Sequence, residues 1–157
     1  MQQLALSTLS SYHIDEISTS KNEPSWLKEY RKKSLSIYQE LPLETSPLYN
    51  KYTDAKKMDP EQVSLTIKSD ASVPDFLKNR LKELENETHI VQIGSNIHRI
   101  NISDELKSKG VVLCSIDDAL KNYGDIIKKV LESTNSNDDK FIALNNAAFN
   151  SGIFVHV

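Results

Sequence analysis

The sequence has 157 residues, of which 38% are hydrophobic and 26% charged, and 19 basic against 22 acidic residues give a net charge of −3. These values are ordinary for a soluble globular protein, and they lack the basic balance typical of a nucleic-acid-binding protein. No apolar run approaches the roughly 20 residues of a membrane span, and the N-terminus has no secretory signal pattern. With Cys114 as its one cysteine, the chain cannot form an internal disulfide, which favours a cytoplasmic location.

Residues 1–19 carry scattered apolar side chains among many serines. Their helical periodicity is weak, and chain ends become ordered only when something holds them in place. We therefore expect a flexible lead, either a frayed helix or a disordered segment.

Residues 20–72 predict an N-terminal helix and an extended connector. Ser20 and Glu23 have the spacing of a capping box. Asn22 is a rival cap, and Pro24 suits the first turn of a helix. The side chains predicted to line one face of this helix are Leu27, Tyr30, Ser34, Ile37, Tyr38 and Leu41. Trp26 is expected to pack against the helix start, with ligand stacking as the alternative.

The connector, residues 42–72, contains three prolines and little periodicity, so we expect it to run over a surface. Tyr49 and Tyr52 lie in this stretch and could contact a partner peptide. The alternating pattern from Val63 to Ile67 predicts a short strand.

Residues 73–149 predict an α+β domain. Pro74 and Asp75 indicate a helix start, and the expected apolar stripe consists of Phe76, Leu77, Leu81 and Leu84. Strands are then expected on either side of a turn at 94–96, which predicts a β-hairpin.

The second half of this domain is expected to contain a strand between two capped helices. Ser103 can cap a short turn that ends at Gly110, and residues 111–116 form a mostly apolar strand. Ser115 can cap a helix that runs to about Leu131, with a weak point or break at Gly124.

Residues 138–157 predict a helix, a turn and a final strand. Ile153, Val155 and Val157 alternate with Phe154 and His156, so the two sets point to opposite faces. A strand this apolar needs neighbours on both edges or a cover, and no residues follow to supply them. We therefore expect residues 150–157 to begin a larger structure that continues past this sequence.

The residues offer no specific site chemistry. His89 and His98 could face each other across the hairpin and hold a metal, but hairpin histidines are more often ordinary half-exposed residues. Cys114 lies in an apolar strand, which favours packing over nucleophilic chemistry. We predict no catalytic, cofactor-binding or metal-binding residue in this chain and expect that it is not an enzyme.

Three stretches together resemble the N-terminal part of the SufB/SufD family of iron–sulfur cluster assembly scaffold proteins. The stretches are Lys21-Asn22-Glu23-Pro24-Ser25-Trp26-Leu27 with Tyr30-Arg31, then Gly110 to Leu120 (GVVLCSIDDAL), and finally Asp138 to Val157 (DDKFIALNNAAFNSGIFVHV). The second stretch has Ile116 where the family pattern has leucine. The three motifs occur in the family's order and with approximately its spacing.

The resemblance implies an α+β region that leads into a long right-handed parallel β-helix. It also implies a SufC-like ABC-type ATPase and a SufB/SufD paralogue as partners of the full-length protein. The family's cysteine and histidine residues for sulfur and cluster handling would lie beyond residue 157, so no functional residue is carried over.

Our leading hypothesis is a non-catalytic scaffold that caps the β-helix within a cytoplasmic SufBCD complex. The isolated fragment is then expected either to self-associate or to leave its C-terminal strand frayed. No nucleic-acid or membrane partner is expected. The alternative is a free-standing interaction module that binds a partner through residues 42–72. A third hypothesis, an enzyme that uses Cys114 in sulfur transfer, has the least support.

Overall fold

The computed structural model describes residues 2–43, 57, 62–68 and 72–157. The chain divides into two compact units, each built from separate stretches of sequence. The helical unit consists of Leu4–Leu65 and Tyr123–Asn150, and the strand unit consists of Thr66–Asn122 and Ser151–Val157 with Met1–Gln3. The predicted α+β class is confirmed, while the predicted segment boundaries stay predictions.

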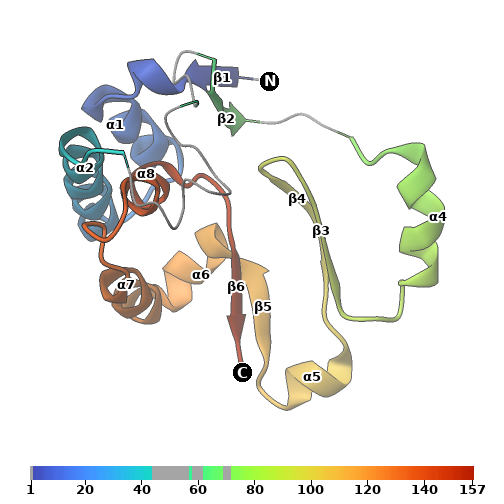
Figure 1. The fold of residues 1–157 in the computed structure, drawn as a ribbon. Helices are drawn as coiled ribbons and strands as arrows, with labels where there is room; N and C mark the ends of the chain where they lie inside the picture. Colours follow the sequence, from blue (N-terminus) through green and yellow to red (C-terminus); the bar gives the residue numbers. More distant parts are fainter. Residues whose placement is uncertain (1, 44–56, 58–61, 69–71) are drawn as a thin grey trace. The chain divides into compact units, whose positions relative to one another are not determined.

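The elements alternate between helices and short strands (Figure 1). The helical unit contains a 3₁₀ helix at Leu6–Thr8 and the helices α1 (Ser11–Ser20), α2 (Ser25–Glu40), α7 (Gly124–Ser133) and α8 (Lys140–Ala148). The strand unit contains α4 (Asp75–Glu83), β3 (His89–Ile93), β4 (Asn96–Asn101), α5 (Asp104–Ser108), β5 (Val112–Ser115), α6 (Ile116–Asn122) and β6 (Ile153–His156). Strands β1 (Gln2–Ala5) and β2 (Ser64–Lys68) pair with each other.

Helix α2 is the centre of the helical unit and packs against both α1 and α8. Its buried side chains are Leu27, Arg31, Ser34 and Leu35, and this spacing places them on one face of the helix. Leu27 and Ser34 belong to the predicted face. Arg31 and Leu35 lie outside that prediction, and Arg31 is treated below.

The N-terminal segment packs against the same core. Leu6, Leu9 and Ile14 are only 3%, 6% and 0% exposed, and they form one cluster with Leu35 and Ala147. The expected flexible lead at residues 1–19 is corrected by this burial. The three apolar residues lie in a 3₁₀ helix, a connecting residue and α1, so no single helical period links them in the sequence.

The turn between α1 and α2 does not contain the predicted capping box. The Ser20 hydroxyl donates to the Ile17 carbonyl within α1, and no side chain caps the start of α2 at Pro24. Asn22 has a φ of 50° and occupies the left-handed region, which asparagine tolerates better than most residues. Glu23 instead directs its carboxylate toward buried groups.

Most of the predicted connector at 42–72 lies outside the described residues, and so do Tyr49 and Tyr52. Its part in binding a partner therefore stays a prediction. Strand β2 confirms the strand expected at Val63–Ile67.

Helix α4 confirms the predicted helix, but not the burial of its apolar stripe. No residue of α4 is buried, and Phe76 is 78% exposed. Leu77, Leu81 and Leu84 are half-buried. Helical spacing separates Phe76 from these three leucines, so the leucines form the inner face without it.

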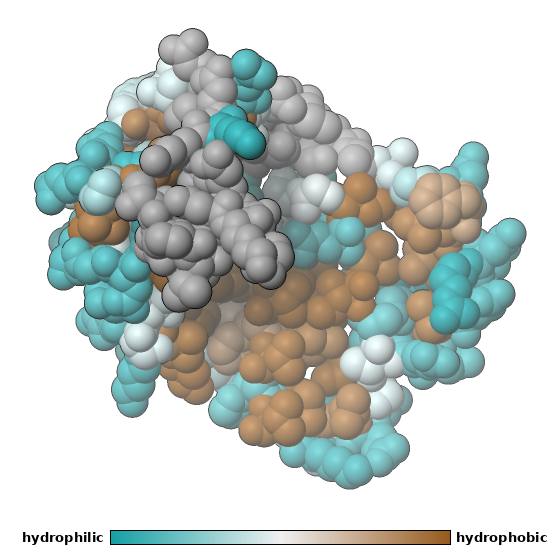
Figure 2. Space-filling model, viewed as in Figure 1, coloured by the Kyte–Doolittle hydropathy of each residue, from teal (hydrophilic) through white to brown (hydrophobic). Residues whose placement is uncertain are grey.

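Strands β3 and β4 form the predicted antiparallel hairpin. Gly94 has a φ of 59° in the two-residue turn, a conformation that glycine adopts without steric cost. Ile90 lies opposite Ile100, and the register shifts between Val91 and Gln92. Figure 2 shows hydrophobic side chains at the surface over these strands.

Two of the predicted helix caps in the strand unit are confirmed. The Ser103 hydroxyl accepts from the Leu106 amide at 3.4 Å at the start of α5. The Ser115 hydroxyl accepts from the Asp118 amide at 3.1 Å at the start of α6. The break expected at Gly124 is also confirmed, because α6 ends at Asn122 and α7 begins at Gly124.

Strand β6 pairs antiparallel with β5, so that Leu113 lies opposite Val155 and Cys114 opposite Phe154. The expectation that this strand lacks a neighbour is therefore wrong on one edge, because β5 precedes it in the chain. The rings of Phe154 and His156 stack at 6.2 Å, as the two-residue period of a strand predicts. The expected parallel β-helix is not part of the described residues.

Candidate functional site

The alternative prediction, a metal site held by His89 and His98, is wrong. His89 pairs with Asn101 across the hairpin, and its Nδ1 lies 2.8 Å from the Glu87 carbonyl. His98 falls at the register shift and has no partner position on β3. In the part of the chain that the structure describes, no group of three or more His, Cys, Asp or Glu residues is arranged to hold a metal ion.

Cys114 lies on β5 and is half-buried as a free thiol. Burial raises the pKa of this thiol, and the nearby Asp118 carboxylate raises the pKa further. A reactive cysteine needs a lowered pKa and an electropositive setting. The environment of Cys114 therefore favours packing over nucleophilic chemistry.

The most specific polar arrangement centres on Arg31 of α2, which is 0% exposed. Its guanidinium donates from Nε to Glu23 Oε2 at 2.8 Å and from Nη2 to Glu23 Oε1 at 2.7 Å. Glu23 Oε2 also accepts from the Ser18 hydroxyl at 2.9 Å. Because both charges are buried, this bidentate geometry compensates the loss of water around each group.

The same guanidinium holds the end of α8. Its Nη1 donates to the Ala147 carbonyl at 3.1 Å and to the Phe149 carbonyl at 2.8 Å. The guanidinium carbon lies 3.9 Å from the centre of the Phe149 ring, which places the cation over the ring face. We call Arg31, Glu23 and Phe149 the arginine anchor. It satisfies carbonyls that a helix C-terminus leaves without intrahelical partners.

Two lysines add contacts at the two ends of α8. Lys140 Nζ donates to the Tyr38 and Leu41 carbonyls at the end of α2, both at 2.6 Å. Lys21 Nζ donates to the Asn150 carbonyl at 2.6 Å, just after α8. The arginine anchor and these lysines fix α8 along α2, and they fix the point where the chain leaves α8 for β6. This chemistry is positioning rather than catalytic.

In the sequence, Arg31 stands out only as part of the Tyr30-Arg31 motif, and its burial is not predicted. The signal that could have revealed it is helical spacing, since Arg31 lies four residues after Leu27 and three before Ser34. Arginine is rarely buried without a partner. The capping-box pattern instead predicts a capping role for Glu23, the partner of Arg31.

A surface cavity of about 450 Å³ lies between α2, α7 and the loop that follows α7. Trp26 and Tyr30 line it, and the Tyr30 hydroxyl donates to the Leu131 carbonyl at 2.9 Å. Ser34 and Ser136 also line this cavity, where Ser136 Oγ lies 3.1 Å from Ser34 Oγ and accepts from the Asn146 side-chain amide at 3.0 Å. Trp26 is half-buried, so its assignment to packing rather than ligand stacking stays a prediction.

Among the helices of the described residues, none is long and apolar enough to cross a bilayer.

A family described as the SufBD protein N-terminal region matches residues 5–157. This range contains the helical unit from Ala5 onward, the arginine anchor and the whole of β6.

Curated relatives carry related names. An iron–sulfur cluster assembly SufBD family protein of Staphylococcus aureus (strain USA300) is 28% identical over 160 residues, which covers 92% of this chain and 33% of the relative. The iron–sulfur cluster assembly protein SufB of Bacillus subtilis (strain 168) is 29% identical over 163 residues, with the same coverage of 92% and 33%. The chain thus spans about a third of the length of these relatives.

Proposed function

Since the chain belongs to the SufBD family and matches its N-terminal region, we propose that it is the N-terminal domain of a SufB/SufD-like component of a SufBCD iron–sulfur cluster assembly complex. The observation that carries this proposal is the family match over residues 5–157. The iron–sulfur cluster is the cargo of the complex and not a cofactor of this chain.

The role of this domain is a non-catalytic scaffold that caps the β-helix of the full-length protein. Two features support the role. The arginine anchor fixes the chain where it leaves α8, and the adjoining strand β6 displays Val155 at 59% exposure. Apolar side chains at the edge of a two-stranded sheet are suited to cover by further strands.

The partners in this proposal are a SufC-like ABC ATPase and a SufB/SufD paralogue, within a cytoplasmic complex. The names of the curated relatives support a place in cluster assembly. Self-association through the exposed apolar residues of β6 is expected when these partners are absent.

Deletion of the gene in its own organism tests the proposal. We expect lower activity of iron–sulfur enzymes under iron limitation, and restoration by the wild-type gene. The Cys114→Ser variant should restore activity fully, because the domain is non-catalytic. Unchanged iron–sulfur enzyme activity after deletion would refute the role in assembly, and failure of Cys114→Ser to restore would refute the non-catalytic role.

A further inference from the structure

A second hollow, of about 320 Å³, lies beside α4 within the strand unit. The residues that line it are Val73, Lys78, Leu81, Lys82, Glu85 and Arg99. Five of them lie on or next to α4, and Arg99 comes from β4. The volume is at the lower end of the roughly 300–1,000 Å³ typical of ligand pockets. The hollow can therefore hold a few side chains but not a large ligand.

The charges around this hollow are unbalanced. Three basic residues, Lys78, Lys82 and Arg99, line it together with one acidic residue, Glu85, although the whole chain has a net charge of −3. Lys78 is paired with Asp75 at 2.5 Å. Throughout the described ranges, no acidic side chain forms an ion pair with Lys82 or Arg99.

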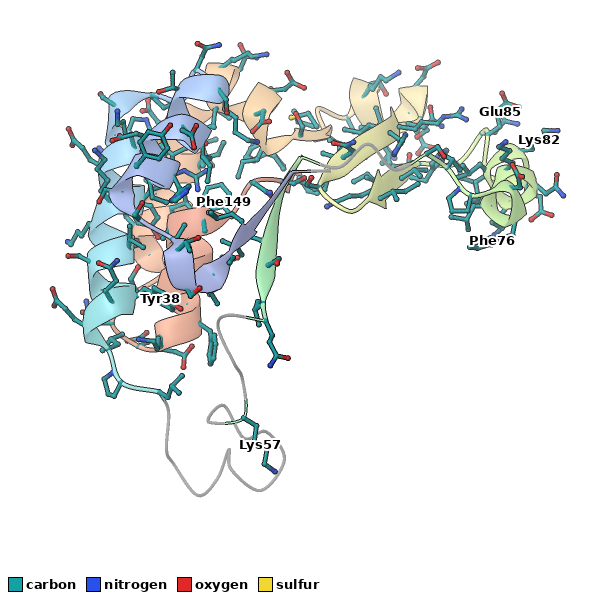
Figure 3. All side chains as sticks on the ribbon, turned by 90° about the horizontal axis from the view of Figure 1, so that it is seen from above. Tyr38, Lys57, Phe76, Lys82, Glu85 and Phe149 are labelled. Carbon is teal, nitrogen blue, oxygen red and sulfur yellow. The ribbon has the colours of Figure 1, made fainter. Side chains whose placement is uncertain are left out.

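The wall of the hollow is partly apolar, because Val73 and Leu81 are half-buried there. Figure 3 shows Lys82 and Glu85 on one side of α4 and Phe76 on the opposite side, so Phe76 is not part of the hollow. Helix α4 has nine residues and buries none of them. Isolated helices shorter than about 12–15 residues are marginal in water, so α4 gains from an added contact surface.

We propose that this hollow binds an acidic, apolar peptide segment of a partner protein. A carboxylate of the segment would accept from the planar guanidinium of Arg99, which suits bidentate recognition, and from the ammonium of Lys82. A neighbouring apolar side chain would contact Val73 and Leu81. Charge complementarity thus recognises the partner. Because the carboxylate is held by Arg99 and Lys82, it also positions the apolar side chain against Val73 and Leu81.

Other anionic occupants fit this surface less well. Nucleic acid binding depends on a basic surface that neutralises many phosphates, and this chain is acidic overall. A free inorganic anion would leave the apolar wall without a contact. The proposal is independent of the proposed role in iron–sulfur cluster assembly, since it depends only on the residues of α4 and β4.

The test uses the chain of residues 1–157 and a short fluorescein-labelled peptide in which pairs of glutamate and leucine alternate. We expect saturable binding by fluorescence anisotropy, with affinity that falls as salt is raised. Amide NMR signals of Val73, Leu81 and Arg99 should shift during the titration. A peptide with glutamine in place of glutamate serves as the neutral control and should bind at least about tenfold more weakly.

The combined substitutions Lys82→Glu and Arg99→Glu should lower the affinity at least about tenfold, as expected for loss of charge-assisted hydrogen bonds. The matched control is Lys129→Glu on α7, which reverses an exposed lysine outside the hollow and should leave the affinity unchanged. Circular dichroism should show the same helix content in both variants.

Three results would overturn the proposal. The first is the absence of saturable binding at low salt. The second is equal affinity of the doubly substituted and wild-type chains. The third is full displacement of the peptide by inorganic phosphate at millimolar concentration, which would identify a general anion site without peptide recognition.

Discussion

The helical unit and the strand unit differ in how they bury hydrophobic side chains. The buried hydrophobic residues of the helical unit are Leu6, Leu9, Ile14, Ile17, Leu27, Leu35, Ile127, Ala143 and Ala147. Among the described residues of the strand unit, Val91 and Ala119 alone are buried to the same degree. The strand unit contains many isoleucines and leucines, but those whose burial the structure describes remain half-exposed.

The helical unit therefore has its own hydrophobic core, whereas the strand unit leaves most of its apolar side chains partly exposed. In the helical unit, a continuous core and the arginine anchor join α1, α2 and α8. Two-stranded sheets are only marginally stable alone in water and gain stability from packing against other elements. We therefore expect substitutions in the helical unit to affect folding, and substitutions in the strand unit to affect association.

The largest effect is expected from Arg31→Ala, which leaves the Glu23 carboxylate buried without its partner. Removal of one member of a buried ion pair costs about 3–5 kcal/mol, so the free energy of unfolding should fall by this amount. Urea denaturation provides the measurement.

The control for Arg31→Ala is Lys32→Ala, since Lys32 pairs with Asp15 at 2.8 Å and both side chains are partly exposed. Exposed ion pairs contribute little to stability. A loss in Arg31→Ala no larger than that in Lys32→Ala would show that the arginine anchor does not stabilise the helical unit.

The next largest loss of stability is expected when a buried hydrophobic side chain of the helical unit is removed, in contrast to an exposed one of the strand unit. Leu27→Ala removes a side chain that is 0% exposed and should cost about 2–5 kcal/mol. Phe76→Ala removes one that is 78% exposed and should change stability by less than about 0.5 kcal/mol. Thermal unfolding of both variants checks the contrast. Similar losses in the two variants would mean that α4 is covered in solution.

Helix caps give a smaller contrast. Asp139 Oδ1 accepts from the Phe141 amide at 2.7 Å and the Ile142 amide at 3.2 Å, so Asp139→Ala should lower stability by about 0.5–2 kcal/mol. Ser103 caps the five-residue α5 through one longer bond of 3.4 Å, so Ser103→Ala should cost less. A larger loss of stability in Ser103→Ala than in Asp139→Ala, measured by chemical denaturation, would contradict this expectation.

The smallest effect concerns the titration of Cys114. Its raised pKa means that less thiolate is present at a given pH. The alkylation rate should therefore increase with pH, and the midpoint of this increase should lie above pH 9.0, the ordinary pKa of a cysteine thiol. Asp118→Asn removes the carboxylate and should move the midpoint down. Mass spectrometry of iodoacetamide-treated native protein follows the rate. Fast alkylation at pH 7 would instead support a reactive cysteine.

The sequence predicts the element types of the strand unit well because each signal is local. Gly94 in a two-residue turn and Ser103 and Ser115 at helix starts all act within a few residues. The same holds for Gly124, which marks the break before α7 of the helical unit. Local hydrogen bonds and backbone preferences determine such features, so composition and spacing reveal them.

The sequence fails where a side chain finds a distant partner. Glu23 has the spacing of a cap, but it binds Arg31, and Arg31 in turn binds carbonyls 116 and 118 residues away at Ala147 and Phe149. The pairing of β6 with β5 is also long-range, so the sequence around the final strand does not reveal this neighbour. No local pattern encodes these contacts.

Hydrogen exchange of the intact chain, followed by mass spectrometry, tests the contrast between the two units most directly. Amides of α2 and α8 should remain protected after those of α4, β3 and β4 have exchanged, because opening of the helical unit disrupts its buried core. Protection of α4, β3 and β4 for as long as α2 and α8 would contradict the account, since it would show that the strand unit has a core of equal stability.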